Sequence, residues 1–347
     1  MRIAIIGYGG VGRAFLQLLL DKKDELSKED INPNVKYVIT SKGGIYNPDG
    51  IDIEEFVNYT KLNKDIMNFS TGEVQHITFN DLLENKDIDM VIEMTPTNKN
   101  TGEPGMTHIV ESLKNGFHVV TANKGPILLA YKRLKEIASK NNVQLGIGCT
   151  TGGALPTING GLMDMAGSTI QSIEGVLNGT TNFILNEMEK NMLEYDEALK
   201  KAQELGIAET DSTLDVEGWD TAIKLLILTN VLMNQEKELK DIKVEGISKI
   251  KISDIQEAAK EGKKYKLVGK TVKVEDGLDM TVRLEKLDTK NPLYGVDDKN
   301  KGIRYVSDTL GDLTIIGGAS GVTPAASSIL RDLINIKRGY KFISNNI

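Results

Sequence analysis

Three glycines near the start of the chain constrain its fold more than any other feature. Gly7, Gly9 and Gly12 follow a short apolar run at residues 3–6 with the spacing G-x-G-x-x-G, and an amphipathic pattern covers residues 11–20. This order predicts a strand, a tight turn and a helix whose N-terminus presents unpaired N–H groups. Gly7 permits the turn, Gly9 lets the backbone approach a pyrophosphate, and Gly12 lets helix and strand pack closely.

The position of this motif decides between two interpretations. A glycine turn of this kind also serves structural purposes in other α/β proteins, and the motif alone is a weak signal. Here it opens a strand–helix–strand pattern, which favours a dinucleotide-binding site. The residues predicted to hold the dinucleotide are Gly7, Gly9, Gly10, Val11 and Gly12.

The first 150 residues alternate apolar runs with amphipathic stretches, which predicts a doubly wound parallel sheet of the Rossmann type. Strands are expected at residues 3–6, 35–39, 90–94, 118–121 and 143–146, and helices at residues 11–20, 107–115 and 127–140. The charged segment 21–34 contains Asn-Pro-Asn and is expected to be an extended loop.

From about residue 151 the pattern changes to that of a separate α+β domain. Helices are expected at residues 155–165, 181–190, 195–205, 216–233 and 253–261, and strands at residues 265–274, 279–284 and 303–307. The segment 314–336 is apolar, then glycine-rich, then helical, and is expected to return to the first domain. The expected organisation is therefore a dinucleotide-binding domain of residues 1–150 and about 314–347, and a second α+β domain of residues 151–313, which would carry the substrate site.

Charge, hydropathy and cysteine content narrow the function classes. The formal net charge of −7 argues against a nucleic-acid partner, because phosphate binding needs a basic face. No apolar run approaches the roughly 18 residues that span a bilayer. One cysteine excludes an intramolecular disulfide framework, and the chain enters a strand too early for a signal peptide. We therefore expect a cytoplasmic protein.

The end of the second expected strand bears on the choice of dinucleotide. A carboxylate there would bind the ribose 2′-OH of NAD, but the strand ends in Thr40, Ser41 and Lys42. Hydroxyls and a cation tolerate or attract a 2′-phosphate, so NADP is permitted. The alternative is that Lys42 is only an exposed loop residue.

The single cysteine, Cys149, lies in a Cys-Thr-Thr sequence like that of aldehyde dehydrogenases that use a thiolate nucleophile. Such a cysteine needs a base, normally a later histidine, whereas His76, His108 and His118 all precede it. A buried structural cysteine is therefore expected.

Two segments carry polar groups where a ligand cleft is expected. Lys124 follows the strand at 118–121 in Thr-Ala-Asn-Lys-Gly-Pro, at the sheet edge that faces ligands in open α/β folds. Gly179 and Thr180 lie in Asn-Gly-Thr-Thr, just before an apolar helix. The structural alternatives are a surface lysine for the first and a helix N-cap at Thr180 or Thr181 for the second.

A third segment places charges on an apolar helix. Asp220 and Lys224 are four residues apart and therefore share one helix face. A buried acid–lysine pair is costly, which makes it either a functional site or a structural ion pair. Glu209 and Asp215 precede it and add carboxylates of the kind that recognise an ammonium group.

Together these segments resemble the homoserine dehydrogenase family over nearly the whole chain. The resemblance rests on the glycine motif, Thr-Ala-Asn-Lys, Asn-Gly-Thr-Thr-Asn-Phe-Ile, and Leu-Gly-x-Ala-Glu…Asp-Val-Glu-Gly-x-Asp…Lys. The glycine-rich stretch from Gly317 also looks like the family's return to the cofactor domain.

The resemblance implies an NAD(P)-dependent enzyme of threonine and methionine biosynthesis that interconverts homoserine and aspartate 4-semialdehyde, and a homodimer formed through the second domain's sheet. It implies that Glu209 and Asp215 bind the substrate's amino end, with Gly179 and Thr180 lining the pocket. Asp220 and Lys224 would orient the substrate oxygen, and Lys124 or Lys224 would give the proton. Thr95, Pro96 and Gly317 would contact the cofactor.

Two departures from the family pattern are visible. Many members carry a glutamate eight residues before the proline of their hinge segment and hold a sodium ion nearby. Counting back from Pro156 gives Gly148, which makes a sodium site doubtful. The chain also has no room for the C-terminal regulatory domain of longer members, so threonine feedback through it is not expected.

Two alternatives remain: another NAD(P) oxidoreductase of a small amino acid or aldehyde, and a nucleotide-binding sensor on a dehydrogenase scaffold. A sensor need keep only the glycine turn, whereas Lys124, Glu209, Asp220 and Lys224 are all present.

Overall fold

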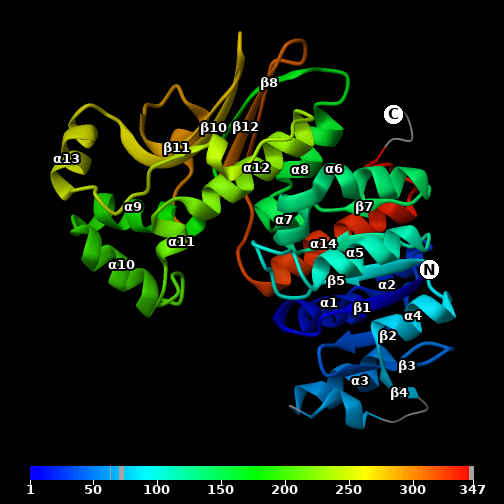
Figure 1. Ribbon diagram of the computed structural model, residues 1–347. Coiled ribbons are helices and arrows are strands. Elements are labelled where there is room, and N and C mark those ends of the chain that lie inside the picture. The colour runs from blue at the N-terminus through cyan, green and yellow to red at the C-terminus, as the bar shows by residue number, and fades with distance from the viewer. Residues whose placement is uncertain (63, 70–73, 344–347) are drawn as a thin grey trace. The chain divides into compact units, whose positions relative to one another are not determined.

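The computed structural model describes residues 1–62, 64–69 and 74–343 and divides the chain into two compact units. Unit 1 comprises Met1–Thr150 with Gly321–Ile347, and unit 2 comprises Thr151–Ser320 (Figure 1). The return to unit 1 begins later than the predicted residue 314, because strand β13 (Asp312–Gly317) still belongs to the sheet of unit 2.

A seven-stranded sheet forms the centre of unit 1. Its order is β4 (Val74–Ile77), β3 (Gly43–Tyr46), β2 (Asn34–Thr40), β1 (Arg2–Ile6), β5 (Met90–Glu93), β6 (His118–Thr121) and β7 (Leu145–Gly146). The strands from β2 to β7 pair in parallel, which confirms the predicted fold class. β3 and β4 add an antiparallel edge that the sequence pattern does not predict.

Helices connect and cover these strands. They are α1 (Gly10–Asp21), α2 (Lys23–Lys28), α3 (Ile53–Lys61), the 3-10 turn η1 (Ile66–Asn68), α4 (Phe79–Asn85), α5 (Gly105–Lys114), α6 (Lys124–Lys140) and α14 (Val322–Lys337). α1 packs against α3 and α14, and α5 packs against α4 and α6 (Figure 1). The central strands are consequently apolar and buried; Ile5, Ile92 and Val120 are fully buried.

The expected loop at residues 21–34 was wrong in part, because α2 lies within it. Asp24 and Glu25 occupy the first turn of α2 and Lys28 its last turn. This charge order complements the helix dipole and stabilises a short helix without an apolar repeat.

Unit 2 contains a six-stranded sheet. Its order is β13 (Asp312–Gly317), β12 (Lys301–Ser307), β8 (Ile170–Val176), β10 (Lys264–Val274), β11 (Gly277–Leu287) and β9 (Lys243–Val244). All pairs are antiparallel except β11 with β9. β8, at the centre, was not predicted, because Glu174 and Gly175 interrupt its apolar pattern.

Helix α12 covers one face of this sheet, where it contacts β8, β10 and β11. The helical segments of unit 2 after its first turn are α8 (Thr157–Asn159), the π-turn η2 (Gly160–Asp164), α9 (Gly179–Asn191), α10 (Tyr195–Glu204), α11 (Thr213–Val216), α12 (Trp219–Leu232), η3 (Leu239–Asp241), α13 (Ile252–Lys260) and η4 (Pro292–Gly295). α12 lies on β10, where Thr229 and Thr271 share a 2.7 Å hydroxyl hydrogen bond. The helix expected at 216–233 is broken at Gly218, whose φ of +83° suits glycine.

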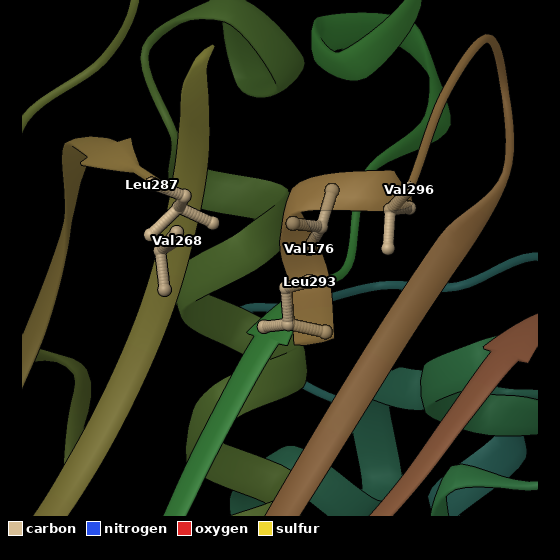
Figure 2. Packing of buried hydrophobic residues seen from close by; sticks show 5 residues of the cluster. All are labelled: Val176, Val268, Leu287, Leu293 and Val296. Carbon is tan, nitrogen blue, oxygen red and sulfur yellow. The ribbon is translucent and has the colours of Figure 1, made fainter. Parts of the chain in front are cut away.

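The other face of the sheet carries an apolar cluster at the end of β8 (Figure 2). The cluster consists of Val176, Val268, Leu287, Leu293 and Val296, which come from three strands and from η4 with the residue after it. It fixes the segment around residues 291–296 beside the point where β8 continues into Leu177–Gly179. Residues 177–179 lead into α9, so this packing also sets the position at which α9 begins.

No helix among residues 1–62, 64–69 and 74–343 is long and apolar enough to cross a bilayer.

Candidate functional site

The glycine turn of unit 1 contains two glycines that the fold requires, Gly7 and Gly12, and one, Gly9, that it does not require. Gly7 has a φ of +97°, and a β-carbon there would lie 2.6 Å from the carbonyl oxygen of Met94. A β-carbon at Gly12 would lie 2.5 Å from the carbonyl oxygen of Gly7. At Gly9 it would meet nothing within 4 Å. Gly9 therefore leaves open space beside the turn, as a bound pyrophosphate requires.

The N-terminus of α1 is suited to hold phosphates. Gly9 is its N-cap and supplies no side-chain hydrogen bond, and the first turn contains no acidic residue. Gly10 and Val11 begin the helix, so their N–H groups are at the positive end of its dipole. These residues fit the cofactor that the sequence predicts.

Ser41 and Lys42 are exposed in the turn that joins β2 to β3. Thr40 shapes this turn: its hydroxyl donates to the carbonyl of Gly43 over 2.8 Å and accepts from the N–H of Lys42 over 3.2 Å. The turn presents no carboxylate, so its chemistry permits a 2′-phosphate.

A buried carboxylate organises the ends of β5 and β6. Glu93 is fully buried and accepts hydrogen bonds from the N–H of Thr95 over 2.9 Å and from the hydroxyl of Thr121 over 2.8 Å. The hydroxyl of Thr95 also donates to it. Three donors compensate for the burial of this charge.

Asn123 connects this carboxylate network to Lys124. Its N–H donates to the hydroxyl of Thr121 over 2.9 Å, and its side-chain oxygen accepts from the N–H of Gly125 over 3.1 Å. The second bond caps α6, whose first residue is the half-buried Lys124. Lys124 thus lies three residues after the end of β6, at the carboxyl edge of the sheet. The side-chain nitrogen of the neighbouring Asn123 donates to the carbonyl oxygens of Thr95 over 3.3 Å and of Pro96 over 3.4 Å, so these residues lie at the same edge.

In unit 2, the predicted acid–lysine pair is present. Lys224 Nζ lies 2.5 Å from Asp220 Oδ2, and the two side chains are 15% and 14% exposed. Lys224 Nζ also donates to the carbonyl oxygen of Leu177 over 2.9 Å. The pair is therefore anchored to the segment that follows β8.

Asn178 joins this pair to a second carboxylate. It is 4% exposed, and its side-chain nitrogen donates to Asp215 over 2.6 Å and to Asp220 over 2.8 Å. Its side-chain oxygen accepts from the N–H of Thr181 over 2.9 Å, so Asn178 is also the N-cap of α9. The structural alternative, an N-cap at Thr180 or Thr181, was wrong by two or three residues. We call Asn178, Asp215, Asp220 and Lys224 the Asn178 cluster.

The remaining predicted substrate residues are near this cluster in sequence but differ in their surroundings. A β-carbon at Gly179 would lie 2.8 Å from the carbonyl oxygen of Lys299, so only glycine fits. The hydroxyl of Thr180 donates to the carbonyl of Ile207 over 3.1 Å. Glu209 has an exposed side chain, and its carbonyl accepts from Gln203. In the part of the chain that the structure describes, the side chain of Glu209 makes no hydrogen bond or ion pair with the cluster.

Two residues that organise these sites were missed. Asn178 was part of the Asn-Gly-Thr-Thr motif, but its role depends on two distant carboxylates that no local pattern reveals. Glu93 gave a usable signal, since it is the one acid within the apolar run at 90–94.

The structure leaves the predicted role of Gly317 open and agrees with the prediction for Cys149. Gly317 is the last residue of β13 in unit 2, opposite Lys301, so its role at the cofactor stays a prediction. Cys149 is buried, with Sγ 3.6 Å from the carbonyl oxygen of Ala325, as expected of a structural cysteine.

The chain matches two family models. The model of the NAD binding domain of homoserine dehydrogenase matches residues 7–147, and the homoserine dehydrogenase model matches residues 156–334. The chain belongs to the homoserine dehydrogenase family. Unit 1, whose glycine turn is described above, is the NAD-binding domain of that family, and the family predicted from the sequence motifs is confirmed.

Individual homoserine dehydrogenases support this assignment. The homoserine dehydrogenase of Methanocaldococcus jannaschii is 40% identical over 98% of this chain and 100% of that protein. The NAD(+)-dependent homoserine dehydrogenase of Pseudomonas canavaninivorans is 32% identical over 96% of both. A proposed homoserine dehydrogenase of Archaeoglobus fulgidus has a crystal structure with a TM-score of 0.85, at 31% identity over 97% of this chain and 99% of that one. The chain therefore has NAD(P)-dependent homoserine dehydrogenase activity.

Proposed function

We propose that the Asn178 cluster binds the substrate of this homoserine dehydrogenase and stabilises the oxygen whose charge changes in the reaction. The observation that carries the proposal is that Asn178 holds two carboxylates beside a largely buried ammonium. L-homoserine and L-aspartate 4-semialdehyde differ at one carbon, which bears a hydroxyl in the first and is an aldehyde in the second, and both carry an ammonium group. A site with acids and a cation side by side matches both features.

The ammonium of Lys224 is suited to the reacting oxygen. It has three N–H donors, of which Leu177 and Asp220 take two. The third is able to donate to the substrate oxygen, which becomes an alkoxide when the aldehyde is reduced. We propose that Lys224 and Lys124 are both required, and that one of them gives the alkoxide its proton.

The carboxylates serve the other end of the substrate. Asp215 accepts a hydrogen bond from Asn178, and Glu209 is exposed six residues earlier in the chain. Carboxylates form charge-assisted hydrogen bonds with an ammonium group. Gly179 leaves no side chain at the start of α9, and Thr180 offers a hydroxyl beside it. We propose that these four residues line the substrate pocket.

The cofactor is held in unit 1 under this proposal. Gly7, Gly9, Gly10, Val11 and Gly12 hold its pyrophosphate, Ser41 and Lys42 lie at its ribose, and Thr95, Pro96 and Gly317 lie near its nicotinamide. When bound, the nicotinamide donates or accepts the hydride. The Glu93 network sets the position of Thr95 and of Lys124 at the same sheet edge.

The test is the oxidation of L-homoserine with NAD and with NADP, followed by the absorbance of the reduced nicotinamide. Wild type turns over, and Lys124→Met and Lys224→Met each lose about 1,000-fold or more in kcat while the cofactor Kd stays within about twofold. Lys290→Met, which removes an exposed lysine of unit 2, retains full activity. Cofactor binding by wild type without turnover would instead indicate a sensor, and full activity in both lysine variants would remove the proposed proton donors.

We also propose a cytoplasmic homodimer formed through the sheet of unit 2. The sheet face opposite α12 carries Glu174 between Lys270 and Arg304, at 3.5 Å from each. Lys270 and Arg304 are 36% and 27% exposed, so this face offers charges to a second copy. Light scattering after gel filtration tests the dimer, and monomers for both wild type and Arg304→Glu would contradict it.

A further inference from the structure

Lys301 is a buried lysine that the reaction described above does not use. It begins β12 and is 7% exposed. Its Nζ donates to the carbonyl oxygen of Gly152 over 3.0 Å. A buried ammonium is retained only where oxygens compensate for its lost hydration, so this contact is part of a specific arrangement.

The carbonyl that Lys301 binds belongs to the first turn of unit 2. The N–H of Leu155 donates to the same oxygen of Gly152 over 3.2 Å, which closes the turn. Gly153 has a φ of +61°, and a β-carbon added there would lie 3.6 Å from Lys301 Nζ. The ammonium therefore sits against the turn itself, which only glycine at 153 readily forms.

Neighbouring contacts attach the rest of this segment to the same face of the sheet. The hydroxyl of Tyr305, four residues after Lys301 on β12, donates to the carbonyl of Thr157. The hydroxyls of Thr151 and Thr157 are 2.6 Å apart. A β-carbon at Gly318, where the chain leaves unit 2, would lie 2.6 Å from Leu155 Cβ. Both ends of unit 2 thus meet at the turn that Lys301 holds.

The family resemblance implies a sodium ion beside this segment, and its residues do not fit one here. Gly148 replaces the expected glutamate, and its N–H donates to Asp332 over 2.7 Å. A monovalent metal ion beside Gly152 would also be repelled by the ammonium already there.

We propose that the ammonium of Lys301 replaces a monovalent metal ion in this homoserine dehydrogenase. Both are single positive charges that bind carbonyl oxygens, but the lysine is tethered and does not depend on salt composition. Lys301 is thereby a positioning residue: it fixes the turn at residues 151–156 through Gly152. The chain folds and turns over with no requirement for sodium or potassium.

The first test compares salts with wild-type enzyme. Thermal unfolding and turnover are measured in sodium, potassium and tetramethylammonium chloride at equal ionic strength, after removal of residual metal. We expect the same Tm and the same kcat in all three salts, and no saturable broadening of the ²³Na resonance by the protein. A saturable rise of Tm in sodium or potassium would overturn the proposal without reference to activity.

The second test uses variants. Lys301→Met lowers Tm by roughly 5 °C, and saturable sodium, potassium or methylammonium restores part of the loss. Lys301→Arg keeps the charge and stays insensitive to the salt. Lys290→Met, the exposed control, behaves as wild type. A Lys301→Met enzyme with the wild-type Tm would contradict the proposal, and so would one whose loss of Tm is not reduced by any small cation. If Lys301→Met does not fold, the salt series with wild-type enzyme decides the question.

Discussion

The cofactor turn of unit 1 and the Asn178 cluster of unit 2 are built in opposite ways. In unit 1 the site consists of backbone: Gly7 and Gly12 are there because side chains would collide with carbonyl groups, and α1 offers its N–H groups. In unit 2 the site consists of side chains whose charges are partly removed from water and held by one amide.

This difference shows which changes each site tolerates. A backbone site depends on the absence of side chains, so a single methyl group damages it while charge changes nearby do little. A charged cluster depends on its internal hydrogen bonds, since a buried charge that loses its partner is strongly destabilising. The following predictions separate these two kinds of dependence.

Among the changes that compare these two sites, the largest effect is expected for Asn178→Ala. The change removes the donor to Asp215 and Asp220, which lowers kcat/KM by about 100-fold and also lowers Tm. Steady-state kinetics with L-homoserine and thermal unfolding measure both. Asn186→Ala is the matched control, because Asn186 is a buried amide of the same helix whose side-chain atoms make no hydrogen bond in the described structure. Equal losses in the two variants would show that the cluster has no special role.

A smaller effect is expected for Gly9→Ala, which raises the cofactor Kd by about tenfold, or about 1.4 kcal/mol. Its Tm stays at the wild-type value, because a β-carbon at Gly9 meets nothing within 4 Å. Gly12→Ala lowers Tm as well, since its β-carbon would lie 2.5 Å from the carbonyl oxygen of Gly7. Fluorescence titration with the reduced cofactor measures the affinity. If Gly9→Ala binds as wild type does, the open space at Gly9 is not the phosphate site.

Glu209→Gln is expected to raise the KM for L-homoserine several-fold, a change of about 1 kcal/mol. The side chain is exposed, so kcat, cofactor affinity and Tm change little. Glu204→Gln, an exposed glutamate just before it, serves as the control. An unchanged KM in Glu209→Gln would leave Asp215 as the one carboxylate for the substrate's ammonium.

The smallest effect concerns a side-chain cluster in unit 1, at the start of β2. Asp87 accepts from Lys36 over 2.8 Å, from Tyr37 over 2.7 Å and from Tyr46 over 2.9 Å. Burial alone would raise the pKa of Asp87, but these hydrogen bonds outweigh it and lower the pKa. The stabilisation is therefore complete above the unfolded pKa of about 3.9 and is lost as pH falls through the folded value.

Asp87→Asn accordingly lowers Tm at neutral pH, and its difference from wild type shrinks once pH falls below about 3.9. Cofactor affinity at neutral pH stays unchanged, because the cluster is at the opposite end of β2 from the glycine turn. Thermal unfolding across pH measures the first expectation. A difference in Tm that persists unchanged in acid would mean that the charge of Asp87 is not its source.

The sequence predicts the backbone site far better than the charged one. Apolar runs and glycine spacing are local, so all five expected strands of unit 1 and its glycine turn are present. The hairpin strand β3 was not predicted because Gly43 and Gly44 interrupt the apolar pattern of a strand. The break at Gly218 was not predicted because apolar residues continue on both sides of it.

The charged site is only partly local. Asp220 and Lys224 were found because four residues separate them on one helix. Asn178 lies 37 residues from Asp215 and 42 from Asp220, so their hydrogen bonds depend on how β8 and α12 pack. Lys301 was not predicted for the same reason, since 149 residues separate it from Gly152.

The most direct test of the central claim is a crystal structure with the reduced cofactor and L-homoserine, a pair that cannot exchange hydride. We expect the homoserine hydroxyl within hydrogen-bond distance of Lys224 Nζ and its ammonium group at Asp215 or Glu209. Homoserine bound with its hydroxyl away from Lys224 and its ammonium away from both carboxylates would contradict the account.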